Sequence, residues 1–213
     1  MNPSATATGR RPRSRKGEGR QLRDEILTAA ERMLLETGSA QAVSIRAVAE
    51  AVGVTPPSIY RHFVDKTALI FEVCARHFTA LEDYIMGTTA GIEDPVQRLA
   101  GLGKAYIEFG VAHPEPYRIM FMTRPDVAPE EFQGRALADS AAFDHLMECV
   151  QACIDADRFR PELTDAYRLS LGFWARVHGL TSLLVSKPAM PWPTDPGFID
   201  EYADMCLRGV VVR

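Results

Sequence analysis

The sequence is poor in cysteine and in long apolar runs, and each scarcity excludes a class of protein. Its 213 residues hold four cysteines, Cys74, Cys149, Cys153 and Cys206, too few and too scattered for a disulfide framework. We therefore predict a reducing, cytoplasmic location. No apolar run approaches the ~20 residues of a membrane-spanning helix. Residues 1–20 carry charges without a following apolar stretch, so we expect neither a secretory signal nor a membrane partner.

Motifs of catalysis and metal binding are also missing. We find no nucleophile motif, no Gly-rich phosphate loop and no repeat with metal-ligand spacing. His145, Glu148 and Cys149 lie three and four residues apart, but they do not form a strong ligand cluster. Cys149 and Cys153 are predicted to be buried thiols, because residues i and i+4 of a helix lie too far apart for an unstrained disulfide. We expect no enzyme, no cofactor and no metal.

Charge is divided unevenly along the chain. Residues 1–66 contain 11 basic and 7 acidic side chains, a formal charge of +4, whereas the remainder contains 13 and 21, a charge of −8; together they give the net charge of −4. A basic first third on an acidic remainder indicates that the first third meets a polyanion.

Apolar residues recur at helical spacing throughout, so the predicted fold class is all-α. The first helix begins near Arg20 and is ended by Gly38, and a longer one runs from about Lys66 to Met86. Further helices are expected at roughly 95–112, 115–123, 130–156, 162–186 and 196–211. Residues 1–19 are rich in Gly, Pro, Ser and Arg and are predicted to be a disordered basic tail.

The stretch "SIRAVAEAVGVTPPSIYRHF", residues 44–63, predicts two short helices around a tight turn. Ser44 is expected to cap the first helix, and Gly53 to end it. Two prolines then start the second helix, where missing backbone N–H groups cost little. We expect the hydroxyl of Thr55 to accept a hydrogen bond from the Ser58 amide. Ile59 should face inward with Phe63.

Two short helices joined in this way form a helix-turn-helix, whose second helix enters the DNA major groove by its N-terminal end. Ser58, Tyr60, Arg61 and His62 are expected to face outward, with side chains suited to phosphates or base edges. The alternative is a three-helix packing unit with a solvated polar face.

Residues 20–70 resemble the DNA-binding domain of the TetR family of transcriptional regulators, through "SIRAVAEAVGVTPPSIYRHFVDKTALI". The resemblance implies a homodimer on a near-palindromic double-stranded DNA operator, with a DNA-binding domain at 20–66 and a helical effector-binding and dimerisation domain at 67–213. It implies phosphate contacts from one set of residues, Ser44, Arg46, Tyr60, His62 and Lys66. It places a second set near the bases: Thr55, Pro57, Ser58 and Arg61. Many relatives carry glycine near Pro57, so the double proline is a variant. The basic tail, including Arg10, Arg13, Lys16 and Arg20, either follows the DNA backbone or only solubilises the chain.

Residues 173–185, "FWARVHGLTSLLV", resemble the Trp-His-Gly-containing C-terminal domain of one branch of the family, and residues 105–122 resemble its partner segment. This second resemblance implies an effector pocket. Small-molecule sites are mostly apolar with a few orienting polar groups, and the candidates that fit are Tyr106, Phe109, Met120, Phe121, Phe143, Met147, Trp174 and His178. Core packing is the alternative for each of them.

The family pairs its last two helices with their mates as a four-helix bundle, here about 162–186 and 196–211. Apolar residues at helical spacing mark the expected face: Leu169, Phe173, Val177, Leu180 and Leu184, then Phe198, Tyr202, Met205 and Val210. Intramolecular core is the alternative. The predicted function is a repressor released from its operator by an apolar effector. The competing prediction is a DNA-binding dimer without a small effector, switched by a protein partner.

Overall fold

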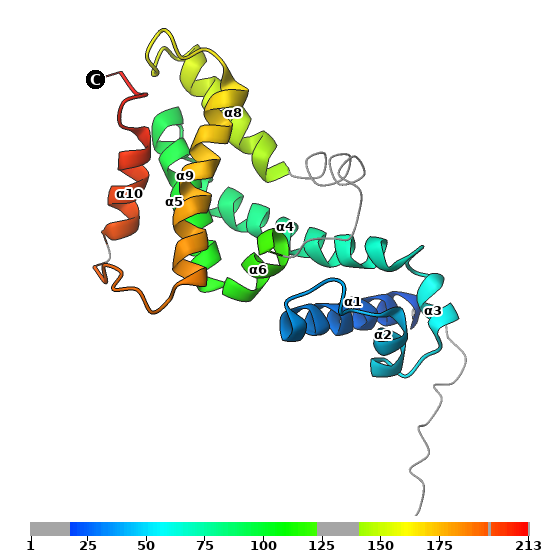
Figure 1. Cartoon of the computed structure of the whole chain (residues 1–213). Helices are drawn as coiled ribbons and strands as arrows, with labels where there is room; N and C mark the ends of the chain where they lie inside the picture. Colours follow the sequence, from blue (N-terminus) through cyan, green and yellow to red (C-terminus); the bar gives the residue numbers. More distant parts are fainter. Residues whose placement is uncertain (1–17, 123–140, 196, 213) are drawn as a thin grey trace, which may run out of the picture. The chain divides into compact units, whose positions relative to one another are not determined.

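The computed structural model describes residues 18–122, 141–195 and 197–212, and these divide into two compact units (Figure 1). Of the described residues, 18–76 and 118–122 form unit 1. Unit 2 consists of residues 77–117, 141–195 and 197–212. The predicted all-α fold is confirmed, since every element named in the described ranges is a helix. The basic-tail residues before Glu18 and the first part of the helix expected at 130–156 lie outside the described ranges.

Unit 1 is built on α1 (Glu18–Thr37), α2 (Ile45–Ala51), α3 (Pro56–Tyr60) and the first part of α4 (Lys66–Thr89). Its core is made of apolar side chains no more than 4% exposed: Ile26, Leu27, Leu34, Val43, Val48, Ile59, Phe63, Leu69, Ile70 and Val73. Gly38 ends α1 with a φ of 63°, and its amide donates to the Leu34 carbonyl, as a C′ glycine does. The apolar side of each helix therefore supplies one shared core.

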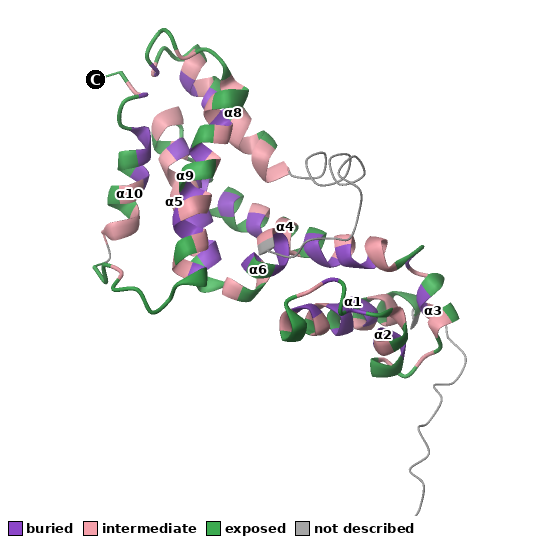
Figure 2. Ribbon diagram, viewed as in Figure 1, coloured by how far each residue is buried: buried purple, intermediate pink, exposed green. Residues whose placement is uncertain are grey.

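Unit 2 is organised around α5 (Pro95–Ala112), which packs against α8 (Ala141–Asp155), α9 (Ala166–Ser186) and α10 (Phe198–Leu207). α6 (Pro114–Met122) follows α5 and begins in this unit. Asp94 caps α5 by accepting from the amides of Val96 and Gln97 at 3.0 and 2.9 Å. Figure 2 shows buried residues along the length of α9, alternating with exposed ones. The core of unit 2 therefore lies where α5 meets its three neighbours.

Two glycines of α5 let α9 approach closely. A Cβ atom at Gly103 would lie 3.2 Å from Val177 Cγ1, and one at Gly110 would lie 2.2 Å from Thr181 Cγ2. The second distance is far below van der Waals contact, so residue 110 has to lack a side chain for the helices to pack as they do.

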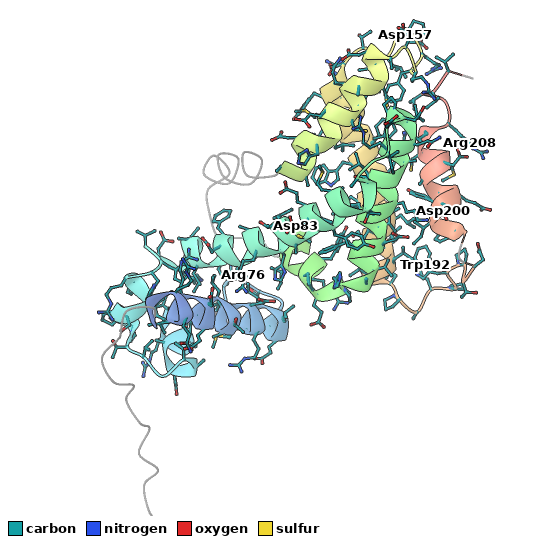
Figure 3. All side chains as sticks on the ribbon, turned by 180° about the vertical axis from the view of Figure 1, so that it is seen from behind. Arg76, Asp83, Asp157, Trp192, Asp200 and Arg208 are labelled. Carbon is teal, nitrogen blue, oxygen red and sulfur yellow. The ribbon has the colours of Figure 1, made fainter. Side chains whose placement is uncertain are left out.

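The ends of α10 are tied by contacts distant in sequence. Lys104 on α5 pairs with Asp200 in the first turn of α10, and Arg208 follows its last turn (Figure 3). Gly209 has a φ of 86°, so the chain leaves the helix there. Val210 then accepts from the Arg160 amide at 2.9 Å. The helix expected at 196–211 is therefore shorter than predicted.

Three members of the predicted dimer stripe are buried within the single chain. Phe173, Val177 and Leu180 are 6, 8 and 7% exposed, on the side of α9 that packs against other helices of unit 2. Val210 is also buried, outside any helix. For these residues the prediction of a dimer face is wrong, because helical periodicity marks a covered face without identifying what covers it.

Within the described residues, no helix combines the length and the apolar character needed to cross a bilayer.

Candidate nucleic-acid interface and aromatic cluster

The helix-turn-helix begins at a capped helix end. Ser44 is extended, with φ −122° and ψ 141°, and its hydroxyl accepts from the Ala47 amide at 3.1 Å, as predicted. Gly53 has a φ of 69°, which turns the chain sharply between α2 and α3. The Val54 amide closes the turn by donating to the Ala49 carbonyl at 2.9 Å. The turn at Gly53 and the Val54–Ala49 hydrogen bond fix the start of α3 relative to α2.

The two prolines start α3, with Pro56 in its first position and Thr55 as N-cap residue. The predicted cap bond at Thr55 is wrong: the Ser58 amide donates to the Thr55 backbone carbonyl at 2.8 Å, and the two hydroxyls lie 3.2 Å apart. Proline at positions 56 and 57 leaves Ser58 with the first amide of the helix, and the tight turn gives that amide a backbone acceptor.

The outer surface of α3 is polar and is anchored by one buried residue. Ile59 is fully buried, whereas its neighbour Tyr60 is 54% exposed. Arg61 is exposed and donates to the Ser58 hydroxyl at 3.1 Å, which holds its guanidinium beside the first turn of the helix. Buried Phe63 lies under the guanidinium of Arg23, 5.0 Å from it. The polar side chains are therefore carried on a firmly packed helix.

The other residues of the predicted DNA set take different positions. Ser44, Arg46, Thr55 and Pro57 are exposed, and Ser58, His62 and Lys66 are half-buried. The Lys66 ammonium donates to the Ala40 carbonyl at 3.2 Å. Burial, then the charges of Arg61 and Arg23, lower the pKa of His62, so this imidazole is neutral at pH 7 and offers a hydrogen bond without a full charge.

Arg23 was missed by the sequence analysis, although it ties three elements of unit 1 together. Its guanidinium lies over the Phe63 ring and pairs with Glu72 of α4 at 2.9 Å. Its position on α1 gives no signal for either contact, because both partners lie far along the chain.

Unit 2 brings several predicted effector residues into one aromatic cluster. The ring of His178 contacts two other rings. Its centroid lies 6.4 Å from that of Tyr106 and 5.7 Å from that of Trp174. Phe143 of α8 meets Trp174 edge-on at 6.1 Å. These four residues, together with Tyr117 and Tyr167, are called the aromatic cluster below.

The hydroxyls of Tyr106 and Tyr117 both point at the imidazole of His178, at 2.9 and 2.8 Å from Nδ1. Burial raises the pKa of Tyr106, and it raises the pKa of Tyr117 to about 12, so both hydroxyls keep their protons. Burial also lowers the pKa of His178, so the imidazole is neutral at pH 7. Tyr117, 61 residues from His178 in sequence, was not among the predicted effector residues.

The remaining predicted effector residues are not joined to this cluster by the contacts described. Phe109 instead lies 5.8 Å from the ring of Tyr84 and 4.8 Å from that of His113. Met147 is half-buried on α8. Met120 and Phe121 belong to unit 1.

Two protein-family models match this chain, one near its N-terminus and one over its C-terminal half. Residues 26–73 match the family model described as bacterial regulatory proteins of the tetR family. Residues 99–209, just over half of the chain, match the model described as the tetracyclin repressor-like C-terminal domain.

One curated relative and two solved structures illustrate the similarity. The HTH-type transcriptional activator FasR of Mycolicibacterium smegmatis is 28% identical over 126 residues, 57% of each protein, so the match spans little more than half of that relative. A protein of unknown function from Rhodococcus sp. RHA1 is 26% identical, with a TM-score of 0.69 over 90% of this chain and 96% of that one.

NalD, the secondary repressor of the MexAB-OprM multidrug efflux pump in Pseudomonas aeruginosa, shares the fold with a TM-score of 0.69 at 22% identity, over 91% of this chain and 98% of NalD. With the capped helix-turn-helix of unit 1 and the helical unit 2, these matches identify the chain as a member of the TetR family of DNA-binding transcriptional regulators, which are not enzymes.

Proposed function

We propose that the protein is a homodimeric repressor that binds a near-palindromic operator through α3 and is released by an apolar small molecule. The observation that carries the DNA-binding part is the contrast along α3 between fully buried Ile59 and exposed Tyr60 and Arg61. The buried residue fixes the helix while its neighbours remain free to reach DNA.

The proposed DNA contacts divide by chemistry. Arg46 and Arg61 are exposed cations, and Ser44, Thr55 and Tyr60 are exposed hydroxyls, all able to donate to phosphate oxygens. Pro57 is exposed and small, so it lets the helix backbone approach the bases, with Arg61 beside it as the strongest candidate for a base edge. Ser58, His62 and Lys66 complete the proposed set.

The proposed effector site is the aromatic cluster of unit 2. Its rings come from α5, α6, α8 and α9, and most of them are buried or half-buried. It offers an aromatic surface with a few polar groups, namely the His178 imidazole, the tyrosine hydroxyls and the Trp174 indole N–H, which suits an apolar molecule with few polar atoms. Phe109 and Met147 of unit 2 remain proposed members of this site, whereas Met120 and Phe121, which belong to unit 1, remain predictions from the sequence.

We propose repression, and not activation, because repression is the family's usual mode of action. FasR is named as an activator and NalD as a repressor, so the shared fold serves both signs. An effector switches either kind of regulator only if it binds the DNA-bound and DNA-free conformations with different affinities.

A fluorescence-anisotropy titration of the purified protein against DNA from its own promoter region tests this proposal. With ~6–10 phosphate contacts, affinity should fall ~10³- to 10⁵-fold between 50 and 200 mM salt. Tyr60→Ala and Arg61→Ala should each weaken binding about 5- to 150-fold, corresponding to ~1–3 kcal/mol. Arg208→Ala, an exposed arginine of unit 2, is the matched control and should bind as the wild type does.

Normal DNA binding by both α3 variants would show that α3 does not read the operator. Release of the wild-type complex by a member of an apolar metabolite library would support the effector site. Specific binding that nothing in the library releases would favour the alternative, a DNA-binding dimer switched by a protein partner. Reporter expression on deletion of the gene gives the sign: repression predicts an increase.

A further inference from the structure

A second feature of unit 2 is a cavity of ≈ 260 Å³ that contains none of the residues of the aromatic cluster. It lies where the last turn of α4, the turn at Ala90–Ile92, the first half of α5 and the middle of α8 come together. Its walls include Met86, Thr89, Ile92, Arg98, Leu102 and Cys149. Met86 is 42% exposed, so the cavity opens to solvent on that side.

The cavity contains an arginine with an unused hydrogen-bond donor. The Nε atom of Arg98 is buried, and no atom of the described residues accepts a hydrogen bond from it. Buried side-chain donors nearly always have an acceptor, and a charged donor without one is especially costly. Arg98 is therefore in an environment that favours an added acceptor, and an anionic one most strongly.

The other polar groups of the cavity already have partners. Thr89 donates to the Ile85 carbonyl at 2.9 Å, and the Cys149 thiol donates to the Pro95 carbonyl at 3.4 Å. The carboxylate of Glu148 lies 3.4 Å from Nδ1 of His145 and is 75% exposed. The Nε–H group of Arg98 is thus the buried donor of this cavity that has no acceptor among the described residues.

The positive charge of Arg98 acts on Cys149, another residue of the cavity wall. A hydrogen bond with Cys153 lowers the pKa of Cys149 against the opposing effect of burial, and the charge of Arg98 together with a hydrogen bond from its side chain lowers that pKa further. An arginine that stabilises a neighbouring negative charge in this way would do the same for a bound anion.

Apart from Arg98, Thr89 and the His145–Glu148 pair, the residues of the wall are apolar or small, and the volume of the cavity sets the size of the molecule that fits. Met86, Ile92 and Leu102 supply hydrocarbon surface opposite one cationic group. At ~30 Å³ for each water-sized group, the cavity holds about eight or nine non-hydrogen atoms. That size and the single cation favour one negative charge on a short hydrocarbon body.

From this geometry we propose that the cavity is a binding site for a small monocarboxylate of about six carbons, with the carboxylate on Arg98 and the hydrocarbon on Met86, Ile92 and Leu102. This proposal does not rest on the proposed effector response, and its test measures occupancy on the protein without DNA.

Ligand-observed NMR titrations of the full-length protein with hexanoate test the site. Hexanamide is the matched probe, with the same number of non-hydrogen atoms and no charge. Arg98→Met keeps much of the length of the side chain and removes its charge, and Arg208→Met is the control at an exposed arginine of the same unit. We expect saturable hexanoate binding to the wild type and to Arg208→Met, and binding at least tenfold weaker for Arg98→Met and for hexanamide.

Three results would overturn the proposal: no saturable hexanoate binding to the folded wild type, equal binding to Arg98→Met, or equal binding of hexanamide. If Arg98→Met does not fold, ¹⁵N spectra of the arginine side chains in the wild type decide the question. Hexanoate should then shift the Nε–H resonance of one arginine and hexanamide should not; an unchanged spectrum refutes the site.

Discussion

Tyr117 and His178 lie 61 residues apart in sequence, and the tyrosine hydroxyl is 2.8 Å from the imidazole Nδ1 and 3.3 Å from the backbone carbonyl oxygen of the same histidine. Tyr106 approaches Nδ1 from a second helix at 2.9 Å. In the neutral tautomer with its proton on Nε2, Nδ1 accepts one hydrogen bond, and the carbonyl gives Tyr117 a second acceptor. The arrangement therefore depends on an uncharged imidazole.

Stability should consequently depend on pH in a way that His178 controls. Burial holds the pKa of folded His178 below its ordinary value of 6.5, so below pH 6.5 the unfolded chain binds a proton that the folded chain does not. Above pH 6.5 the contribution of His178 to the free energy of unfolding should be constant. As the pH drops below 6.5 the free energy of unfolding should fall, and His178 can account for at most ~1.4 kcal/mol per pH unit. Urea unfolding between pH 5 and 8 measures the slope.

His178→Gln is the control for that experiment. It should reduce the slope below pH 6.5 and leave the part due to His62, whose pKa is also lowered and which acts with the same sign. A slope identical in the variant and the wild type would mean that His178 does not titrate with folding.

Gly110 should be intolerant of even one added carbon. A Cβ atom added there would lie 2.2 Å from Thr181 Cγ2, and Thr181 is fully buried and donates to the Val177 carbonyl at 2.7 Å, so it cannot move aside freely. Gly110→Ala is expected to lower the free energy of unfolding by ~1–3 kcal/mol, measured by thermal or denaturant unfolding.

Gly87→Ala is the matched control in α4, where an added Cβ would meet nothing within 4 Å. Alanine favours a helix over glycine by up to ~1 kcal/mol, so this variant should be as stable as the wild type or more stable. Equal loss of stability in both variants would show that α5 and α9 do not pack closely at Gly110.

The two caps of the helix-turn-helix should differ in their contribution to stability. The Ser44 hydroxyl accepts from the Ala47 amide, so Ser44→Ala should lower the free energy of unfolding by ~1 kcal/mol. Among the described residues, the Thr55 hydroxyl meets the Ser58 hydroxyl and caps no helix amide, so Thr55→Ala should cost less. Chemical unfolding without DNA separates this effect from any DNA contact. A larger loss for Thr55→Ala would contradict the assignment of the caps.

The sequence predicted the elements that local signals define. The helix expected at 95–112 begins and ends at those residues, because Asp94 caps it and Pro95 fits its first position. Ser44 and Gly38 were likewise recognised from local chemistry. At Thr55 the prediction failed, because the tight turn gives the Ser58 amide a backbone acceptor that the residue pattern does not reveal.

What depends on packing between distant segments could not be predicted. The periodicity of α9 marks Phe173, Val177 and Leu180 as covered residues, but α5 and α8 cover that side within the chain. Tyr117 reaches His178 only because α6 follows α5 and meets α9. The unused donor of Arg98 is also invisible in sequence, because it depends on which acceptors surround it.

The dimer face should therefore be sought on the exposed side of α9. Leu183 is 48% exposed there, and Met205 on neighbouring α10 is 56% exposed. We predict that Leu183→Glu weakens the homodimer at least tenfold, because a twofold interface uses the same surface of both subunits and would bury the charge twice. Sedimentation equilibrium over a range of protein concentrations measures the effect.

Val64→Glu is the matched control, since Val64 is 74% exposed and belongs to unit 1. It should leave the dimer unchanged. The circular dichroism spectrum of Leu183→Glu should match the wild type, because an exposed residue tolerates a charge in the single chain. If Leu183→Glu remains as dimeric as the wild type, Leu183 lies outside the interface. If Val64→Glu dissociates instead, the interface lies in unit 1.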